Sequence, residues 1–191
     1  MPLAGVPPDG PVSRTGRALA RQRSAGGLAA DGGPAGQDGG MRLDAGAARQ
    51  RFAGARVARL ATAGLDGQPH LVPFTFALDR HPGQEDRIYS AVDAKPKSTT
   101  DLRRLRNIRA NPRVAVLADH YEDDWGALWW VRADGRATIL EEAAAMAPAL
   151  ALLAGRYPQY REQPPGGPVI CIQVTHWAGW AAAPGGTGCG A

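Results

Sequence analysis

The sequence has few cysteines and no long apolar run, and these two shortages exclude several classes of protein. Only two of its 191 residues are cysteines, Cys171 and Cys189. Two thiols are too few for a disulfide framework or a cysteine-based metal site, which indicates the reducing cytoplasm. No apolar run approaches the roughly 20 residues of a membrane span. We therefore expect a cytoplasmic protein with no membrane association.

The excess of positive charge is small as well. The 22 basic and 18 acidic residues leave a net charge of +4, which does not demand a nucleic-acid partner. Because the positive charge is concentrated in one segment, a small anionic ligand is the better expectation. The histidines lack metal-ligand spacing, and no serine or cysteine has the setting of an activated nucleophile. We expect no metal site, and the catalytic residues stay unassigned.

The two ends of the chain differ in composition from its middle. Residues 1–40 are rich in glycine and proline and show neither helical nor strand periodicity, which is typical of disorder. Residues 184–191 are interpreted in the same way. The patterned sequence between them, residues 41–183, has the length of one domain.

Strand-like runs separated by turns fill much of this domain. Strands are expected at residues 55–63, 69–78, 87–92, 114–118, 127–133 with 136–140, and 169–174. A turn is predicted at Leu65-Asp66-Gly67, and Asp134-Gly135 is expected to break the strand between residues 133 and 136. Trp177 and Trp180 are expected in the core or at a subunit interface. A small antiparallel barrel packs such strands well. The predicted fold class is mainly β with α, a six-stranded antiparallel split β-barrel with short flanking helices.

Two of the flanking helices carry clear sequence signals. Asp44 is placed to cap a short helix with Ala48 and Phe52 on one face. The alanine-rich residues 141–155 predict a longer helix. Pro148 falls within it and predicts a break or an early turn there.

The segment between the strands at 87–92 and 114–118 predicts an anion site. Ser98 is expected to cap a short helix, with Asp101 three residues on, and Asn111-Pro112 to end it. Helical spacing gives this helix an apolar side and an opposite, polar side: Leu102, Leu105 and Ile108, against Arg103, Arg106 and Asn107. Free N–H groups at its start, two preceding lysines and the arginines favour a phosphate. A merely solvated arginine face is the alternative interpretation.

Four motifs, in order along the chain, carry a resemblance to a known family. They are Leu60-Ala61-Thr62 with Asp66-Gly67-Gln68-Pro69-His70 and Val72-Pro73; Lys95-Pro96-Lys97 with Leu105-Arg106-Asn107-Ile108 and Asn111-Pro112-Arg113-Val114; Asp119-His120-Tyr121 with Trp125; and Leu128-Trp129-Trp130-Val131-Arg132 with Gly135. The pattern resembles the pyridoxamine-phosphate-oxidase-like family of split β-barrels. Within that family it is similar to an actinobacterial branch regarded as dependent on the deazaflavin coenzyme F420. The resemblance covers about residues 43–183.

The resemblance implies a flavin-type cofactor in a groove between the two subunits of a homodimer. The residues it assigns to the cofactor are Lys95, Lys97, Ser98, Arg103, Arg104 and Asn107 at or before the helix, His70, Val72 and Pro73 beside the ring, and Trp129, Trp130 and Arg132 from the facing side of the groove. Ser98 departs from this branch, which usually has a further basic residue there.

The implied function is an F420-dependent oxidoreductase that transfers a hydride between the reduced deazaflavin and a small organic acceptor. An oxidoreductase of the same fold that binds FMN is one alternative. A non-catalytic anion- or nucleic-acid-binding module that uses the arginine face is another. Residues 93–113 contain no aromatic side chain on which a base could stack, so no nucleic-acid partner is expected. Nothing in the sequence selects the substrate.

Overall fold

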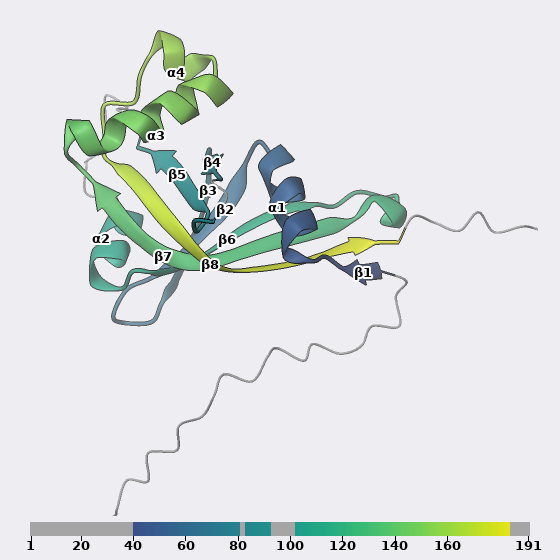
Figure 1. Ribbon diagram of the computed structural model, residues 1–191. Helices are drawn as coiled ribbons and strands as arrows, with labels where there is room; N and C mark the ends of the chain where they lie inside the picture. Colours follow the sequence, from purple (N-terminus) through teal and green to yellow (C-terminus); the bar gives the residue numbers. More distant parts are fainter. Residues whose placement is uncertain (1–39, 81–82, 93–101, 184–191) are drawn as a thin grey trace, which may run out of the picture. The chain divides into compact units, whose positions relative to one another are not determined.

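The computed structural model describes residues 40–80, 83–92 and 102–183. Apart from Gly40, the tails for which disorder is expected lie outside this part of the chain. Its elements, shown in Figure 1, are β1 (Gly40–Arg42), α1 (Ala45–Gly54), β2 (Ala58–Ala63), β3 (Pro69–Phe74), β4 (Ala77–Asp79), β5 (Arg87–Ala91), α2 (Arg103–Ala110), β6 (Arg113–His120), the 3-10 helix η1 (Trp125–Ala127), β7 (Trp129–Leu140), α3 (Ala143–Arg156), α4 (Gln159–Glu162) and β8 (Val169–Ala182). No helix in these residues is long and apolar enough to cross a membrane.

The strands form one open antiparallel sheet. The order is β3-β2-β6-β7-β8-β5-β4, with β1 beside the far half of β8. The edge strands β3 and β4 are separated in sequence only by Thr75 and Phe76. Because an extended residue spans about 3.5 Å, the two edges must lie close together at this crossover. No ladder pairing joins β3 to β4 among the described residues, so the sheet is open between these two strands.

The predicted number of six strands is wrong, since the sheet has eight. The expected strand at 69–78 is interrupted at Thr75 and Phe76, where the chain crosses from one edge to the other. The short β1 pairs its three residues with Trp180–Ala182 of β8. Its glycine-rich sequence has no strand periodicity, so only the partner strand reveals it.

The break predicted at Asp134-Gly135 is a shift of register and does not end the strand. Strand β7 runs through these residues, and they lie at a shift of register against β8. A Cβ atom on Gly135 would lie 2.4 Å from the carbonyl oxygen of Gln173. The glycine is needed here because two backbones approach each other closely at a bulge. Glycine in a strand can therefore indicate close packing as well as a turn.

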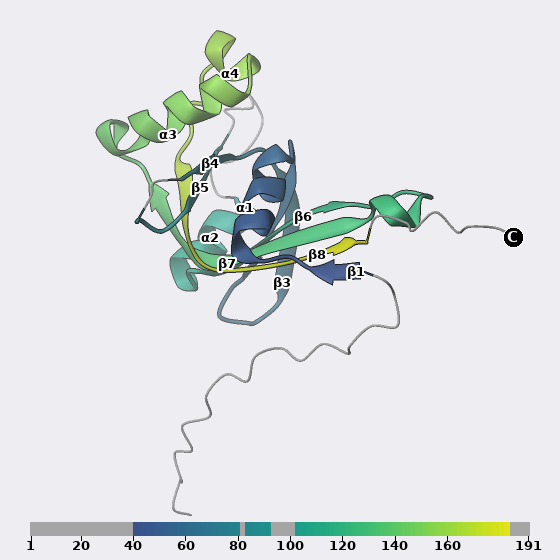
Figure 2. The ribbon, with the colours of Figure 1, turned by 45° about the vertical axis from the view of Figure 1, so that its right-hand side comes forward.

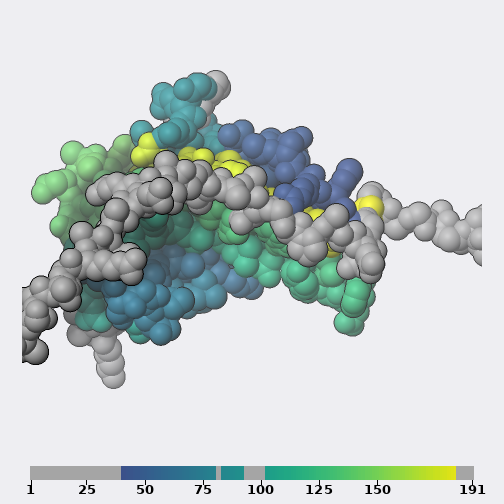
Figure 3. All heavy atoms as spheres, turned by 90° about the horizontal axis from the view of Figure 1, so that it is seen from below, coloured from purple at the N-terminus to yellow at the C-terminus, as the bar shows by residue number. Residues whose placement is uncertain are grey.

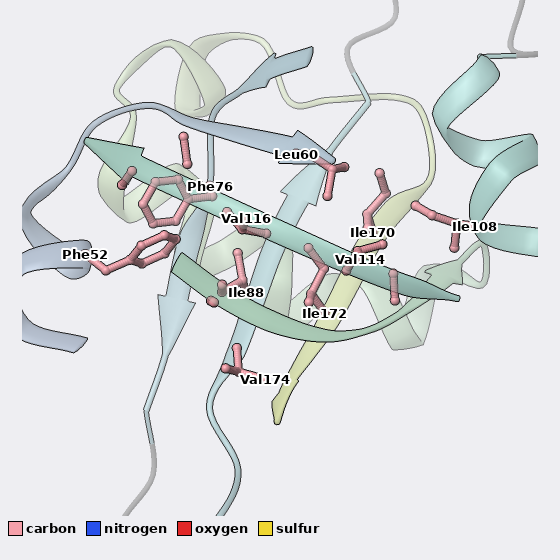
Figure 4. Packing of buried hydrophobic residues seen from close by; sticks show 14 of the residues in the cluster. Phe52, Leu60, Phe76, Ile88, Ile108, Val114, Val116, Ile170, Ile172 and Val174 are labelled. Carbon is pink, nitrogen blue, oxygen red and sulfur yellow. The ribbon is translucent and has the colours of Figure 1, made fainter. Parts of the chain in front are cut away.

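Buried side chains of β2, β5, β6, β7 and β8 meet in the larger of two apolar clusters, which Figure 4 shows from close by. Phe52 of α1 packs at 4.6 Å, centroid to centroid, on Phe76 of the crossover. The ring of Trp177 packs edge-on against Phe52, so the expectation of a core position for this tryptophan is confirmed. Asp44 caps α1 by accepting from the N–H of Ala47 at 2.8 Å, as the sequence predicts.

Helix α3 covers the end of the sheet formed by β4 and β5, and α4 packs against α3 (Figures 1 and 2). The break expected at Pro148 is wrong, since α3 continues through it. Both Pro148 and Ala144, whose carbonyl loses its helical partner, are exposed, so water can satisfy that carbonyl. The hydroxyl of Tyr157, at the end of α3, accepts from the Phe76 N–H at 3.1 Å and thereby holds the crossover.

Candidate functional site

A pocket of about 430 Å³ opens beside the β3–β4 crossover. Its lining comes from the crossover, the end of β5, the start of α2, α4 and the loop before β2: Val57, Pro73, Phe74, Thr75, Ser90, Ala91, Val92, Leu102, Arg104 and Tyr160. The walls combine apolar side chains with three hydroxyl groups and one guanidinium. That size and composition are typical of small-molecule sites.

The basic helix begins later than the sequence predicts. Helix α2 starts at Arg103, and the apolar Leu102 occupies its N-cap position, so Ser98 is not the cap of this helix. Lys95, Lys97 and Ser98 lie outside the described residues. The described residues on either side of them, Val92 and Leu102, both line the pocket.

One of the predicted cofactor residues, Asn107, points into the protein instead of sharing the open face of α2. It is 7% exposed, and its Nδ2 donates to Oγ1 of Thr62 on β2 at 3.1 Å. The sequence prediction of an outward Asn107 is wrong because a buried hydroxyl on the sheet satisfies the amide. The inward positions of Leu105 and Ile108 are confirmed.

The arginines of α2 differ in their surroundings. Arg103 and Arg106 are exposed, whereas Arg104 is half-buried and lines the pocket. Arg109, nearer the other end of the helix, pairs at 2.6 Å with Glu141, and both side chains are exposed. Among the described residues that line the pocket, Arg104 is therefore the one with a positive charge that can contact a ligand.

Strand β3 brings two further predicted residues to this region. Pro73 lines the pocket, whereas Val72 packs against the core. His70 pairs across the strands with Thr62, and its Nδ1 is buried without a hydrogen-bond partner. Burial, followed by the charges of Arg103 and Arg104, lowers the pKa of His70. The imidazole is therefore neutral at neutral pH.

The remaining predicted residues, on the first part of β7, lie elsewhere in the same chain. Trp129 pairs with His120 at the end of β6, and Arg51 lies over its ring at 5.4 Å. Arg132 pairs with Asp134 at 3.0 Å. The β6–β7 hairpin ends at η1, at the opposite end of the sheet from α2, and it projects in the space-filling view (Figures 1 and 3). Neither Trp129, Trp130 nor Arg132 is among the described residues that line the pocket.

Sequence reasoning missed three polar residues of the pocket. Thr75 and Tyr160 share a hydrogen bond of 2.9 Å between their hydroxyl groups. Ser90 is buried within β5. The sequence does carry a signal for Ser90, because it is a single serine within the mostly apolar strand β5. Nothing local pairs Thr75 with Tyr160, since they are 85 residues apart.

Comparisons with known proteins agree on the fold. The family described as pyridoxamine 5'-phosphate oxidase matches residues 45–181. A FAD-binding protein from Mesorhizobium loti is 23% identical, with 75% of this chain and 99% of that chain covered and a TM-score of 0.57. A conserved hypothetical protein from Mycobacterium tuberculosis is 25% identical over 73% and 85% of the two chains, with a TM-score of 0.56.

A heme storage protein from Vibrio cholerae also has this fold. It is 15% identical, with 67% of this chain and 88% of that chain covered and a TM-score of 0.51. No curated protein matches this chain. The likenesses that are under 25% identical concern the fold alone.

Proposed function

This chain belongs to the pyridoxamine 5'-phosphate oxidase family, and from that premise we propose that it is an oxidoreductase that uses the deazaflavin coenzyme F420. Its second substrate is a small organic molecule that accepts or gives the hydride. The observation that carries the proposal is the pocket beside the crossover, which has apolar walls and a half-buried Arg104 at the start of α2.

The residues present fit a cofactor with a planar ring and a phosphate. Pro73, Phe74 and Leu102 supply an apolar wall, and Ser90 and Thr75 supply hydroxyl groups that can orient polar ring edges. Arg104 would hold the phosphate, because a guanidinium forms paired hydrogen bonds with phosphate oxygens. Lys95 and Lys97 belong to the segment that starts and ends at this pocket and would add charge.

The spread of charge favours the deazaflavin over FMN. Coenzyme F420 continues past its phosphodiester into a tail of glutamates, whereas FMN ends at one phosphate. Arg103, Arg104 and Arg106 distribute positive charge over about one helical turn. When bound, the deazaflavin supplies a hydride, and the protein's part is to position the ring and to exclude water.

The proposal predicts micromolar or tighter binding of coenzyme F420 and clearly weaker binding of FMN. Fluorescence titration of both cofactors into the full-length protein measures the two affinities. The affinity for F420 should fall as salt rises, because part of the attraction involves exposed arginines. If the affinity for FMN equals or exceeds the affinity for F420, then FMN is the cofactor and the proposal of a deazaflavin is wrong.

A homodimer is the second part of the proposal. Trp129, Trp130 and Arg132 do not line the pocket of their own chain, so in this proposal they contribute to a cofactor groove from a second copy. A two-fold dimer would place the β7 residues of each copy at the pocket of the other. Light scattering of the purified protein is expected to give twice the mass of the chain.

Mixing two variants tests this shared groove. Arg104→Ala and Arg132→Ala are each expected to bind F420 weakly when pure. After the subunits of a one-to-one mixture exchange, about a quarter of the grooves should recover full affinity, since one groove of each mixed dimer has both residues. Absence of recovery, with subunit exchange shown by mass spectrometry, would place both residues outside a shared groove.

A further inference from the structure

We propose that His70 is a third positive group of the anion site, and that it takes up a proton when an anionic group binds beside Arg103 and Arg104. The inference deepens the proposed function and rests on it for the natural ligand, a phosphate-bearing cofactor. The role of His70 itself follows from the packing of β2, β3 and α2.

The backbone register places His70 under the first turn of α2. His70 lies opposite Thr62 in the β2–β3 pair, so the two side chains are on the same face of the sheet. Asn107 of α2 reaches that face and donates to Thr62. Residues three and four positions earlier in a helix lie on the same side, one turn away. For Asn107 these residues are Arg104 and Arg103.

The polar groups near His70 leave its Nδ1 available to a ligand. Thr62 and Asn107 are bonded to each other. The carboxylate of Asp66, in the turn between β2 and β3, accepts from the N–H of Gln68 at 3.2 Å. The buried Nδ1 of His70 has no partner among the described residues, although a buried nitrogen without a hydrogen bond is costly. A phosphate or sulfate oxygen would supply that partner.

The charges determine the direction of the proton change. Burial and then the two arginines lower the pKa of His70 in the free protein. A bound anion cancels the repulsion from the arginines and favours the imidazolium, so it raises that pKa. The bound state therefore holds more protons than the free state. Protonation of His70 increases the affinity for the anion most at pH values below the pKa of free His70. This increase is lost as the pH rises through the higher pKa of the complex.

Sulfate is the first probe, because it carries the same charge at every pH used and needs no cofactor chemistry. The Cε1–H resonance of His70 is followed by NMR over about pH 5 to 8, the range in which histidine titrates. It is assigned by its absence in His70→Gln. Added sulfate is expected to raise the midpoint by about one pH unit, which corresponds to about tenfold tighter anion binding at low pH. An unchanged midpoint would overturn the proposal.

Cofactor affinity provides the second measurement. In the wild type, the affinity for F420 is expected to weaken about fivefold to tenfold between pH 5.5 and 8, and His70→Gln should remove most of this dependence. The matched control is His176→Gln, which changes an exposed histidine of β8. This variant should keep the pH dependence of the wild type. A wild-type affinity that does not change with pH would overturn the coupling. Failure of F420 to bind would refute the proposed function, while the sulfate titration would still test His70.

Discussion

Replacing Asp86 by alanine is expected to lower the free energy of unfolding by about 3 kcal/mol, because two donors lose a charged acceptor. Asp86 is 8% exposed. Its Oδ2 accepts from Nε of Arg49 at 2.5 Å and from Nε1 of Trp177 at 2.8 Å. These bonds join α1 to β8 through the loop before β5. Urea denaturation of the cofactor-free protein measures the change.

The matched control is Glu141→Ala. Glu141 pairs with Arg109, and both side chains are more than half exposed. Pairs of this kind contribute about 0–1 kcal/mol. If Asp86→Ala and Glu141→Ala cost the same, then the burial of Asp86 does not determine its contribution.

Replacing Arg104 by alanine is expected to reduce the affinity for the cofactor about tenfold to a hundredfold, the effect of a lost charge-assisted hydrogen bond. Arg104 is half-buried and lines the pocket at the start of α2. Fluorescence titration measures the affinity. A melting curve of each cofactor-free variant shows that the fold is intact.

Arg109→Ala is the control on the same helix. It removes an equal charge, but Arg109 is exposed, pairs with Glu141 and is absent from the lining of this pocket among the described residues. Its effect on affinity should stay below about threefold, which is the effect of a screened and distant charge. Equal losses in Arg104→Ala and Arg109→Ala would mean that only the net charge of α2 matters.

Several elements could be predicted because their signals are local. Asp44 caps α1, and Gly67 has the positive φ of 71° that a tight turn needs. Ala48 and Phe52 face the core. In each case, the residues that determine the structure lie within one or two turns of each other in the sequence. The apolar side of α2, with Leu105 and Ile108, belongs to the same class.

Other features depended on partners that are distant in sequence. Asn107 looks like part of a polar helix face until Thr62, 45 residues earlier, is seen to accept its hydrogen bond. Asp134-Gly135 has the composition of a turn, but β8 pairs with β7 on both sides of it. The crossover at Thr75 and Phe76 could not be located from alternation, because both edge strands continue the same pattern.

The sequence by itself determined the family, since its motifs follow one another in the required order, and it located the positive charge between β5 and β6. Only the tertiary structure decided which candidate residues share a site. Pro73 and Arg104 meet at the pocket because the chain crosses between the sheet edges there. Trp129, Trp130 and Arg132 do not, because they lie on β7, and β2 and β6 separate β7 from β3 even where Arg132 is level with Pro73. At about 4.8 Å between neighbouring strands, the three spacings from β3 to β7 exceed the reach of one side chain.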